Sequence, residues 1–174
     1  SADGARVLAD VLHYLWVQLD QNKLNPRAPG SLARTAPDLH DGLSYRDLSR
    51  LLARHEFEGG YTIDEVVDAE GAALDHVIVQ TMMRIDVPRP IEPGGTFSFE
   101  IEWEYPINDS EKISERTGYE IFDDGNAIFE IAHWFPRLAP YTDSDGWQNK
   151  QFLGRGEFAL EFGDYRVAID VPAD

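Results

Sequence analysis

The stretch that decides the fold spans residues 118–174 and reads GYEIFDDGNAIFEIAHWFPRLAPYTDSDGWQNKQFLGRGEFALEFGDYRVAIDVPAD. Two runs in it alternate apolar and polar residues, which is typical of strands with one buried face. The first run places Ala127, Phe129, Ile131 and His133 on one side. The second run has one apolar side made of Phe158, Leu160 and Phe162, followed by Tyr165, Val167, Ile169 and Val171. The sequence therefore predicts two strands here.

Turn and loop signals lie around these runs. Asp123–Asn126 (DDGN) predicts a hairpin turn, because Gly and Asn accept a positive φ at little cost. The segment from Trp134 to Gly154 holds two tryptophans and two prolines. So irregular and aromatic a segment is either a packed connection or one wall of a site.

The rest of the chain also favours strands. The apolar side chains of residues 96–105 point one way and the glutamates the other, a period of two that only a strand produces. Further strands are expected at 12–19, 61–67, 73–79 and 82–87. Ser44 and Asp47 form a capping box for a helix over 45–54, and 21–42 is a polar connection. We expect an all-β domain, a saddle-like β-sandwich or curved sheets of about eight strands with that one short helix.

Length and composition restrict the partners. A chain of 174 residues suits a single domain over 1–174, and its net charge of −17 argues against nucleic acid or an anionic membrane as a partner. The chain has no cysteine, which excludes disulfides and thiolate metal sites. No signal peptide is visible, and both a cytoplasmic and a periplasmic location remain open.

Motifs for a resident metal are absent from the sequence. No two of the five histidines lie three to five residues apart, the spacing of paired zinc ligands. His55-Glu56 starts like a zinc-protease helix, but Gly59 stands where the second histidine is needed. Asp143–Gly146 (DSDG) shares part of a calcium loop and is more simply a turn. We expect no metal site and no catalytic residue in this chain alone.

Two other groups of residues could carry chemistry. Glu100, Glu102 and Glu104 share one strand face, which is either the solvated side of a sheet or the carboxylate row of a small glycosidase. His133, next to Trp134, is either a core histidine bonded to backbone or a residue that faces a pocket.

Several long motifs, in order, resemble the N-terminal domain of bacterial zinc aminopeptidases of the aminopeptidase N family. They are LWVQLDQN (15–22), MRIDVP (83–88), FEIEWEYPIN (99–108), GNAIFEIAHWFPR (125–137), GWQNKQFLG (146–154), GEF (156–158), FGDY (162–165) and VPAD (171–174). The likeness covers nearly all of the chain after about Leu12. Residues 1–11 are atypical, or the first strands usual in the family are partly missing.

The resemblance implies a saddle of β-sheets that precedes a thermolysin-like catalytic domain. Zinc is expected in that missing domain, which carries the His-Glu-x-x-His helix that this chain lacks. The implied function is a substrate-cleft domain, non-catalytic by itself, whose partners are the catalytic domain of the same polypeptide and a peptide substrate. The alternative is an independent β-sandwich binding module for carbohydrate or protein that uses Trp134 and Trp147. A domain cut from a larger protein would also self-associate through its exposed interface.

The resemblance also names a substrate-binding segment. A Gln or Glu that holds the α-amine of the substrate in the family corresponds to His133 here. Trp134 and Phe135 would line the adjoining wall, and Arg137 would fix the segment. A protonated histidine would repel an ammonium group, whereas a neutral one could accept a hydrogen bond from it.

Overall fold

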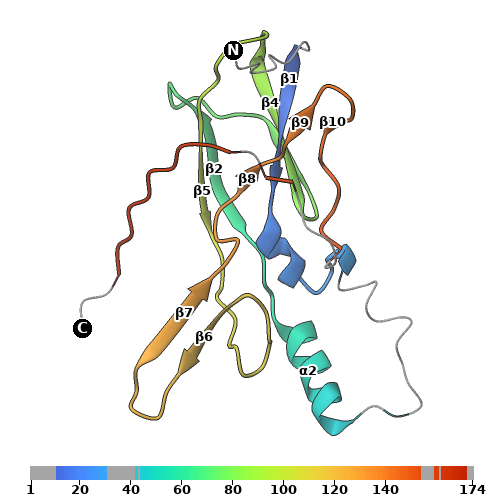
Figure 1. Ribbon diagram of the computed structural model, residues 1–174, viewed down its shortest axis with the longest axis vertical. Coiled ribbons are helices and arrows are strands. Elements are labelled where there is room, and N and C mark those ends of the chain that lie inside the picture. The colour runs from blue at the N-terminus through green and yellow to red at the C-terminus, as the bar shows by residue number, and fades with distance from the viewer. Residues whose placement is uncertain (1–10, 31–41, 43, 154–158, 161, 172–174) are drawn as a thin grey trace, which may run out of the picture.

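The structure is a computed structural model, and it describes residues 11–30, 42, 44–153, 159–160 and 162–171. These residues form ten strands, one short 3-10 helix and one α-helix (Figure 1). Three of the strands are only two residues long, so the longer strands number seven within the described part. The all-β prediction is confirmed. No helix among the described residues is long and apolar enough to cross a membrane.

The largest sheet has four strands in the order β3-β4-β1-β8. Its members are β1 (Leu12–Gln18), β3 (His76–Val79), β4 (Met82–Ile91) and β8 (Arg137–Leu138), and all neighbours are antiparallel. Leu15 and Val17 are buried on β1 with the half-buried Trp16 between them, and Met83 and Ile85 are fully buried on β4. The period-two pattern of these strands therefore turns one apolar face inward.

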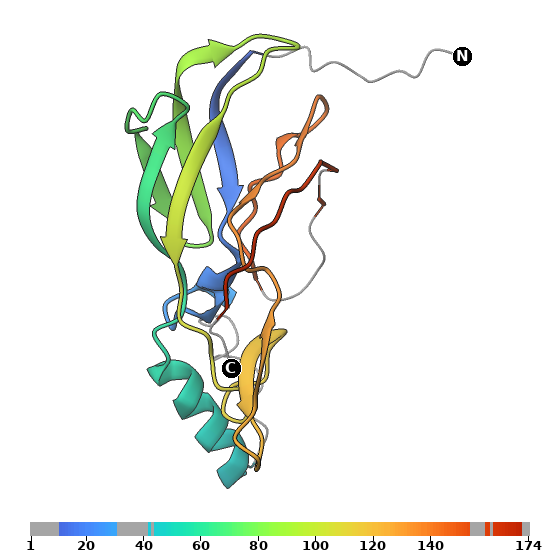
Figure 2. The same cartoon turned by 90° about the vertical axis from the view of Figure 1, so that its left-hand side faces the viewer.

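A second sheet covers that inner face. It pairs β2 (Thr62–Asp68) with β5 (Phe99–Glu104), and Val66, Phe99 and Ile101 pack against Val17, Met83 and Ile85. Figure 2 shows the two layers face to face. The result is a small sandwich whose core lies between two sheets.

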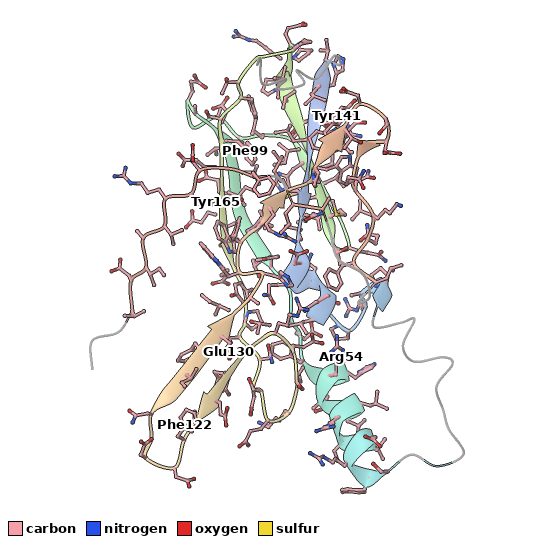
Figure 3. The ribbon with its side chains drawn as sticks, viewed as in Figure 1. Arg54, Phe99, Phe122, Glu130, Tyr141 and Tyr165 are labelled. Atoms are coloured by element: carbon pink, nitrogen blue, oxygen red, sulfur yellow. The ribbon has the colours of Figure 1, made fainter. Side chains whose placement is uncertain are left out.

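The hairpin of β6 (Thr117–Ile121) and β7 (Ala127–Ile131) stands apart from the sandwich. It turns at Asp123–Asn126, where the Phe122 amide donates to the Asn126 carbonyl at 2.8 Å, as the turn signal predicts. Every residue of β7 is exposed, so the expected buried face is wrong. Figure 3 shows Phe122 and Glu130 on this hairpin, beyond the end of the sandwich, and within the described residues the hairpin is a two-stranded sheet of its own.

The helix α2 (Tyr45–Glu56) begins as the capping box predicts. The Asp47 amide donates to the Ser44 hydroxyl at 3.1 Å. The helix continues two residues past the predicted end at Arg54. None of its side chains is buried, and in both views it projects from the same end of the molecule as the β6–β7 hairpin.

The second alternating run does not form the predicted strand. Residues 159–160 and 162–171 are extended but pair with no other strand in the described part of the chain. Phe162 is fully exposed, and Tyr165, Ile169 and Val171 are each more than two-thirds exposed. A period of two fixes which side chains share a face, but it supplies no neighbouring edge for the backbone to bond. Phe158 lies outside the described residues.

Other boundaries also differ from the prediction. The 3-10 helix η1 (Asp20–Leu24) opens the polar connection expected over 21–42, and residues 31–41 of that connection lie outside the described part of the chain. β4 continues to Ile91 through two prolines near its exposed end, where the missing amide donors are tolerated. β5 is shorter than 96–105, and only an isolated bridge from Ala73 precedes β3.

The short hairpin of β9 (Tyr141–Thr142) and β10 (Gly146–Trp147) completes the fold. Residues 143–145 turn between the two strands, which agrees with the simpler interpretation of Asp143–Gly146.

Candidate functional site

The segment that the family resemblance selects, His133–Arg137, links β7 to β8. It starts with a turn, not with the strand that the alternation of His133 with Phe129 and Ile131 predicts. His133 has a φ of 57°, the left-handed conformation that interrupts the period of two. Its side chain therefore leaves the face that Phe129 and Ile131 share.

Three side-chain donors from outside the segment hold its backbone. Gln21 Nε2 donates to the Ala132 carbonyl at 2.7 Å and to the His133 carbonyl at 3.2 Å. The Tyr61 hydroxyl donates to the same His133 carbonyl at 2.6 Å. Trp103 Nε1 donates to the Trp134 carbonyl at 3.2 Å. Gln21 lies in η1, Tyr61 directly precedes β2, and Trp103 lies in β5, so the sandwich and its flanking residues fix the path of the segment.

An ion pair fixes the far end of the segment. Arg137 Nε donates to Asp20 Oδ2 at 2.8 Å, and Arg137 Nη2 donates to the same oxygen. The Asp20 side chain is only 2% exposed, and that of Arg137 only 13%. A buried carboxylate needs such a partner, because an unpaired charge there would be strongly destabilising.

Aromatic rings continue from the sandwich across the segment to the C-terminal residues. The ring of Trp103 lies 6.2 Å from that of Trp134, which lies 4.9 Å from Phe135. Phe135 in turn meets the ring of Tyr165 edge-on at 6.1 Å. All of these contacts fall within the distances at which aromatic pairs attract each other. We call Trp103, Trp134, Phe135 and Tyr165 the aromatic row.

On the other side of the segment, the His133 ring meets the Phe152 ring edge-on at 6.4 Å. Lys23 Nζ lies 5.3 Å from the centre of that same Phe152 ring and 3.2 Å from a carboxylate oxygen of Glu115. The surroundings of His133 are thus partly apolar and partly charged.

These surroundings shift two ionisable groups. Burial lowers the pKa of His133, the charges of Lys23 and Arg137 lower it further, and the Asp20 carboxylate opposes them. The imidazole is therefore mainly neutral at pH 7 and keeps one acceptor nitrogen. Burial, with Asp20 next in importance, raises the pKa of Tyr61 far above its ordinary value, so its hydroxyl stays a donor.

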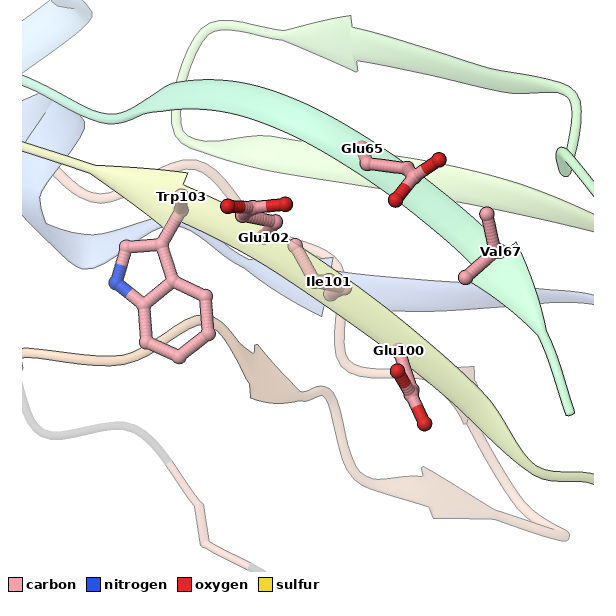
Figure 4. Close-up of a pocket in the computed structure, with 6 residues that line it drawn as sticks. All are labelled: Glu65, Val67, Glu100, Ile101, Glu102 and Trp103. Atoms are coloured by element: carbon pink, nitrogen blue, oxygen red, sulfur yellow. The ribbon is translucent and has the colours of Figure 1, made fainter. Parts of the chain in front are cut away.

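The three glutamates of β5 lie on the solvent-exposed face of their sheet, which is one of the two alternatives stated for them. Glu100, Glu102 and Glu104 are exposed and alternate with the half-buried Ile101 and Trp103. A hollow of about 360 Å³ on this face is lined by Glu65, Val67, Glu100, Ile101, Glu102 and Trp103 (Figure 4). Glu65 and Glu102 are direct cross-strand partners. No group of three or more His, Asp or Glu side chains among the described residues could hold a metal ion.

The structure places the three predicted site residues side by side on one anchored segment. It also shows contacts of four residues for which no role was predicted, namely Asp20, Gln21, Tyr61 and Phe152. One signal was available: Asp20, Gln21 and Asn22 are three polar residues directly after an apolar strand, and two of them are buried. The partners of Asp20 and Gln21 in this segment lie 117 and 111 positions away, which no local pattern reveals.

Comparisons with protein-family models, with curated proteins and with solved structures find no match for this chain.

Proposed function

We propose that this chain is the N-terminal substrate-cleft domain of a zinc aminopeptidase-like protein and is non-catalytic by itself. The observation that carries the proposal is the anchoring of residues 133–137 by Gln21, Tyr61, Trp103 and Asp20. A site wall has to keep its shape when substrate arrives, and side-chain donors from a rigid sheet supply that shape.

The chemistry of His133 is compatible with recognition of a free α-amine. Its pKa is lowered, so the ring presents an acceptor at neutral pH and does not repel an ammonium group. Trp134 and Phe135 are half-buried and supply an apolar wall beside it. These residues bind and orient, and zinc in the catalytic domain would supply the hydrolytic chemistry.

Exposed apolar residues give the proposal a second support. Ile128, Phe129 and Ile131 on β7 and Phe162, Val167 and Ile169 near the C-terminal end are all 40% exposed or more. Apolar groups in this number are typical of a surface that another domain covers. We assign this surface to the catalytic domain of the same polypeptide.

Two measurements test the proposal. The purified chain should show no zinc-dependent hydrolysis of aminoacyl anilides, and stoichiometric bound zinc together with turnover would contradict this. The reading frame beyond Asp174 should continue for several hundred residues and encode a His-Glu-x-x-His motif. A stop codon directly after Asp174 would instead favour an independent module.

The aromatic row is also compatible with the alternative function, a binding module for carbohydrate or protein. Trp134, Phe135 and Tyr165 form a continuous series of rings at one surface, as many sugar-binding faces do. Titration of the chain with oligosaccharides, monitored by tryptophan fluorescence, distinguishes a binding module from a substrate-cleft domain. Saturable quenching that Trp134→Ala abolishes and that Trp16→Phe, a change on β1, leaves intact would favour the module.

A further inference from the structure

The C-terminal segment 164–171 is extended, yet its backbone is bonded to no strand in the described part of the chain. Figure 1 draws it in red as a line without a strand arrow. The amides and carbonyls of an extended chain are normally paired, as in a sheet ladder. A strand whose groups are unpaired is a template on which another strand can add. This segment is therefore expected to have a partner strand.

The side chains of the segment alternate strictly between two faces. One face is apolar, and its four side chains are each more than half exposed: Tyr165, Val167, Ile169 and Val171. The other face is small or charged and is also exposed: Asp164, Arg166, Ala168 and Asp170. Ala168 lies midway between Arg166 and Asp170. Outward from Ala168, the two directions therefore have apolar residues at the same positions and opposite charges at the matching ones.

This symmetry makes the segment complementary to a second, antiparallel copy of itself. When two copies pair antiparallel about Ala168, Arg166 of each copy faces Asp170 of the other, so two opposite-charge pairs form. On the other face of the pair, every apolar side chain lies opposite another apolar one. Cross-strand pairs of both kinds stabilise a sheet.

Other arrangements of the two strands lose these contacts. A parallel pair in register places Arg166 opposite Arg166 and Asp170 opposite Asp170, which is destabilising. A parallel pair shifted by four residues joins Arg166 to Asp170 only once and does not close on a two-fold axis. An antiparallel pair shifted by one residue puts apolar side chains opposite polar ones, and a shift of two separates Arg166 from Asp170. The pattern therefore selects antiparallel pairing about Ala168.

The two charged side chains are available for this pairing. Both are exposed, and neither has a hydrogen bond or an ion pair with another residue of the described chain. The start of the segment is held by the ring of Tyr165, which meets Phe135 edge-on at 6.1 Å. The sandwich thus presents the strand with its pairing groups exposed.

We propose that residues 164–171 are a self-association strand, through which two copies of this chain form an antiparallel two-stranded ribbon about a two-fold axis at Ala168. The pairing is isologous and closes at a dimer. It uses the backbone edge of the strand and leaves the apolar face of the ribbon to the catalytic domain, to which the proposed function assigns it. The dimer does not depend on that function, whose site is residues 133–137.

The small interface sets the expected affinity. A two-stranded ribbon by itself is only marginally stable, and the net charge of −17 on each chain adds repulsion. The dimer should therefore be weak, with a dissociation constant on the order of 0.1 mM. Sedimentation velocity from about 10 µM to 1 mM, in about 0.15 M salt, covers this range. A chain that stays monomeric throughout overturns the proposal.

Exchange of the two charges tests the pairing. Arg166→Asp and Asp170→Arg each place like charges opposite each other twice in the dimer and should weaken it at least about tenfold. The double variant restores both opposite-charge pairs at the natural net charge, so it should dimerise like the natural chain. Weakening that the double variant does not reverse would mean that the segment pairs with a surface other than itself, which overturns the proposal.

Glu130→Arg is the matched control for Asp170→Arg. It makes the same change in net charge at an exposed residue of β7. A dimer that depends only on the total charge would strengthen in both variants, because both reduce the repulsion between two acidic chains, and that result overturns the proposal. A dimer that depends on the strand pair should weaken with Asp170→Arg alone. Circular dichroism checks that each variant keeps its fold.

Single cysteines test the orientation, because the chain has none of its own. Ala168→Cys lies on the two-fold axis and should form a disulfide-linked dimer on mild oxidation, since facing residues bring their Cβ atoms to about 5 Å. Asp164→Cys should not, because its two copies would lie more than about 20 Å apart along the ribbon. Efficient linkage at both positions would indicate a parallel pair and contradict the proposal.

Discussion

The conformation of one residue, His133, determines how the candidate site is presented. Its left-handed φ of 57° is uncommon for a residue other than glycine and costs about 1 kcal/mol. Two side-chain donors to its carbonyl, Gln21 and Tyr61, offset that cost. The turn is thereby held by contacts that reach across the fold, and its shape depends on them.

The two hydrogen bonds that Gln21 and Tyr61 donate to the His133 carbonyl form a clamp on the turn, and the Tyr61 hydroxyl offers a test of it. Tyr61→Phe removes one of the two hydrogen bonds to the His133 carbonyl and should lower the free energy of unfolding by about 1 kcal/mol. Gln21 remains as a donor, so the loss is not larger. Tyr105→Phe is a matched control, because the Tyr105 ring packs edge-on against Tyr61 at 5.5 Å. Equal losses for the two variants in urea unfolding would contradict the clamp.

The titration of His133 gives a pH-dependent prediction. Burial lowers the pKa of the folded imidazole below its unfolded value, so the unfolded chain binds the proton more readily. The stability that neutral His133 contributes is therefore complete above about pH 6.5 and is lost as the pH falls toward the folded pKa. The stability difference between the natural chain and His133→Asn should shrink between pH 7.5 and 5. An NMR titration that finds an ordinary or raised pKa would contradict this.

At the scale of elements, the β2–β5 sheet has a well-packed inner face and an outer face on which two like charges repel each other. Phe99 and Ile101 pack on the core cluster. On the outer face Glu65 lies directly opposite Glu102, and like charges in cross-strand pairs are destabilising. The burial of the inner face outweighs this repulsion, so the sheet forms in spite of it.

Reversing one of those charges should stabilise the sheet. Glu102→Lys turns the pair with Glu65 into an attractive one and should raise the free energy of unfolding by about 0.5 kcal/mol at low salt. Glu104→Lys is the control, since its cross-strand partner is Thr62. The double variant Glu65→Lys/Glu102→Lys restores like charges and should lose the gain. A gain that survives in the double variant would show that net charge, and not the pair, is responsible.

At the scale of the whole molecule, the excess of acidic residues opposes compactness. The net charge of −17 belongs to a chain with 32 acidic and 15 basic residues. Mutual repulsion of so many negative groups destabilises the folded state, and salt screens it. The buried Asp20–Arg137 pair is screened much less, because solvent ions do not reach it.

Added salt should therefore stabilise the protein. The thermal unfolding midpoint should rise between about 0.02 and 0.3 M sodium chloride, a range in which the screening length falls from about 20 to 6 Å. Scanning calorimetry measures it, and a neutral osmolyte of equal osmolarity is the control. A midpoint that falls with salt would mean that attractive surface ion pairs outweigh the repulsion.

Local signals in the sequence predicted elements well and their assembly poorly. The capping box at Ser44, the turn at Asp123–Asn126 and the two faces of β5 depend on neighbours within a few residues, and all three predictions are confirmed. The apolar runs of β7 and 165–171 predicted buried faces that the structure does not contain. A strand pattern says which side chains are apolar, whereas burial depends on which other sheet lies above them.

In the candidate site, too, the sequence could predict the local run of residues but not the distant residues that contact it. His133, Trp134 and Phe135 are consecutive, and a sequence motif can select such a run. Asp20, Gln21 and Tyr61 reach it from 72 to 117 positions away. Contacts over that separation are set by the sandwich topology, and alternation along one strand carries no information about them.

The separate β6–β7 hairpin determines how amide hydrogens in this protein exchange with solvent. Among the described residues, its ladder from Thr117 to Ile131 joins no other sheet, although one isolated bridge links Tyr119 to Asp109. By contrast, β1 is bonded on both sides by β4 and β8. The hairpin can open without unfolding the sandwich, so deuterium should enter its backbone early and at a rate insensitive to stabilising substitutions elsewhere. The amides of β1 should exchange last, and only when the whole sandwich unfolds.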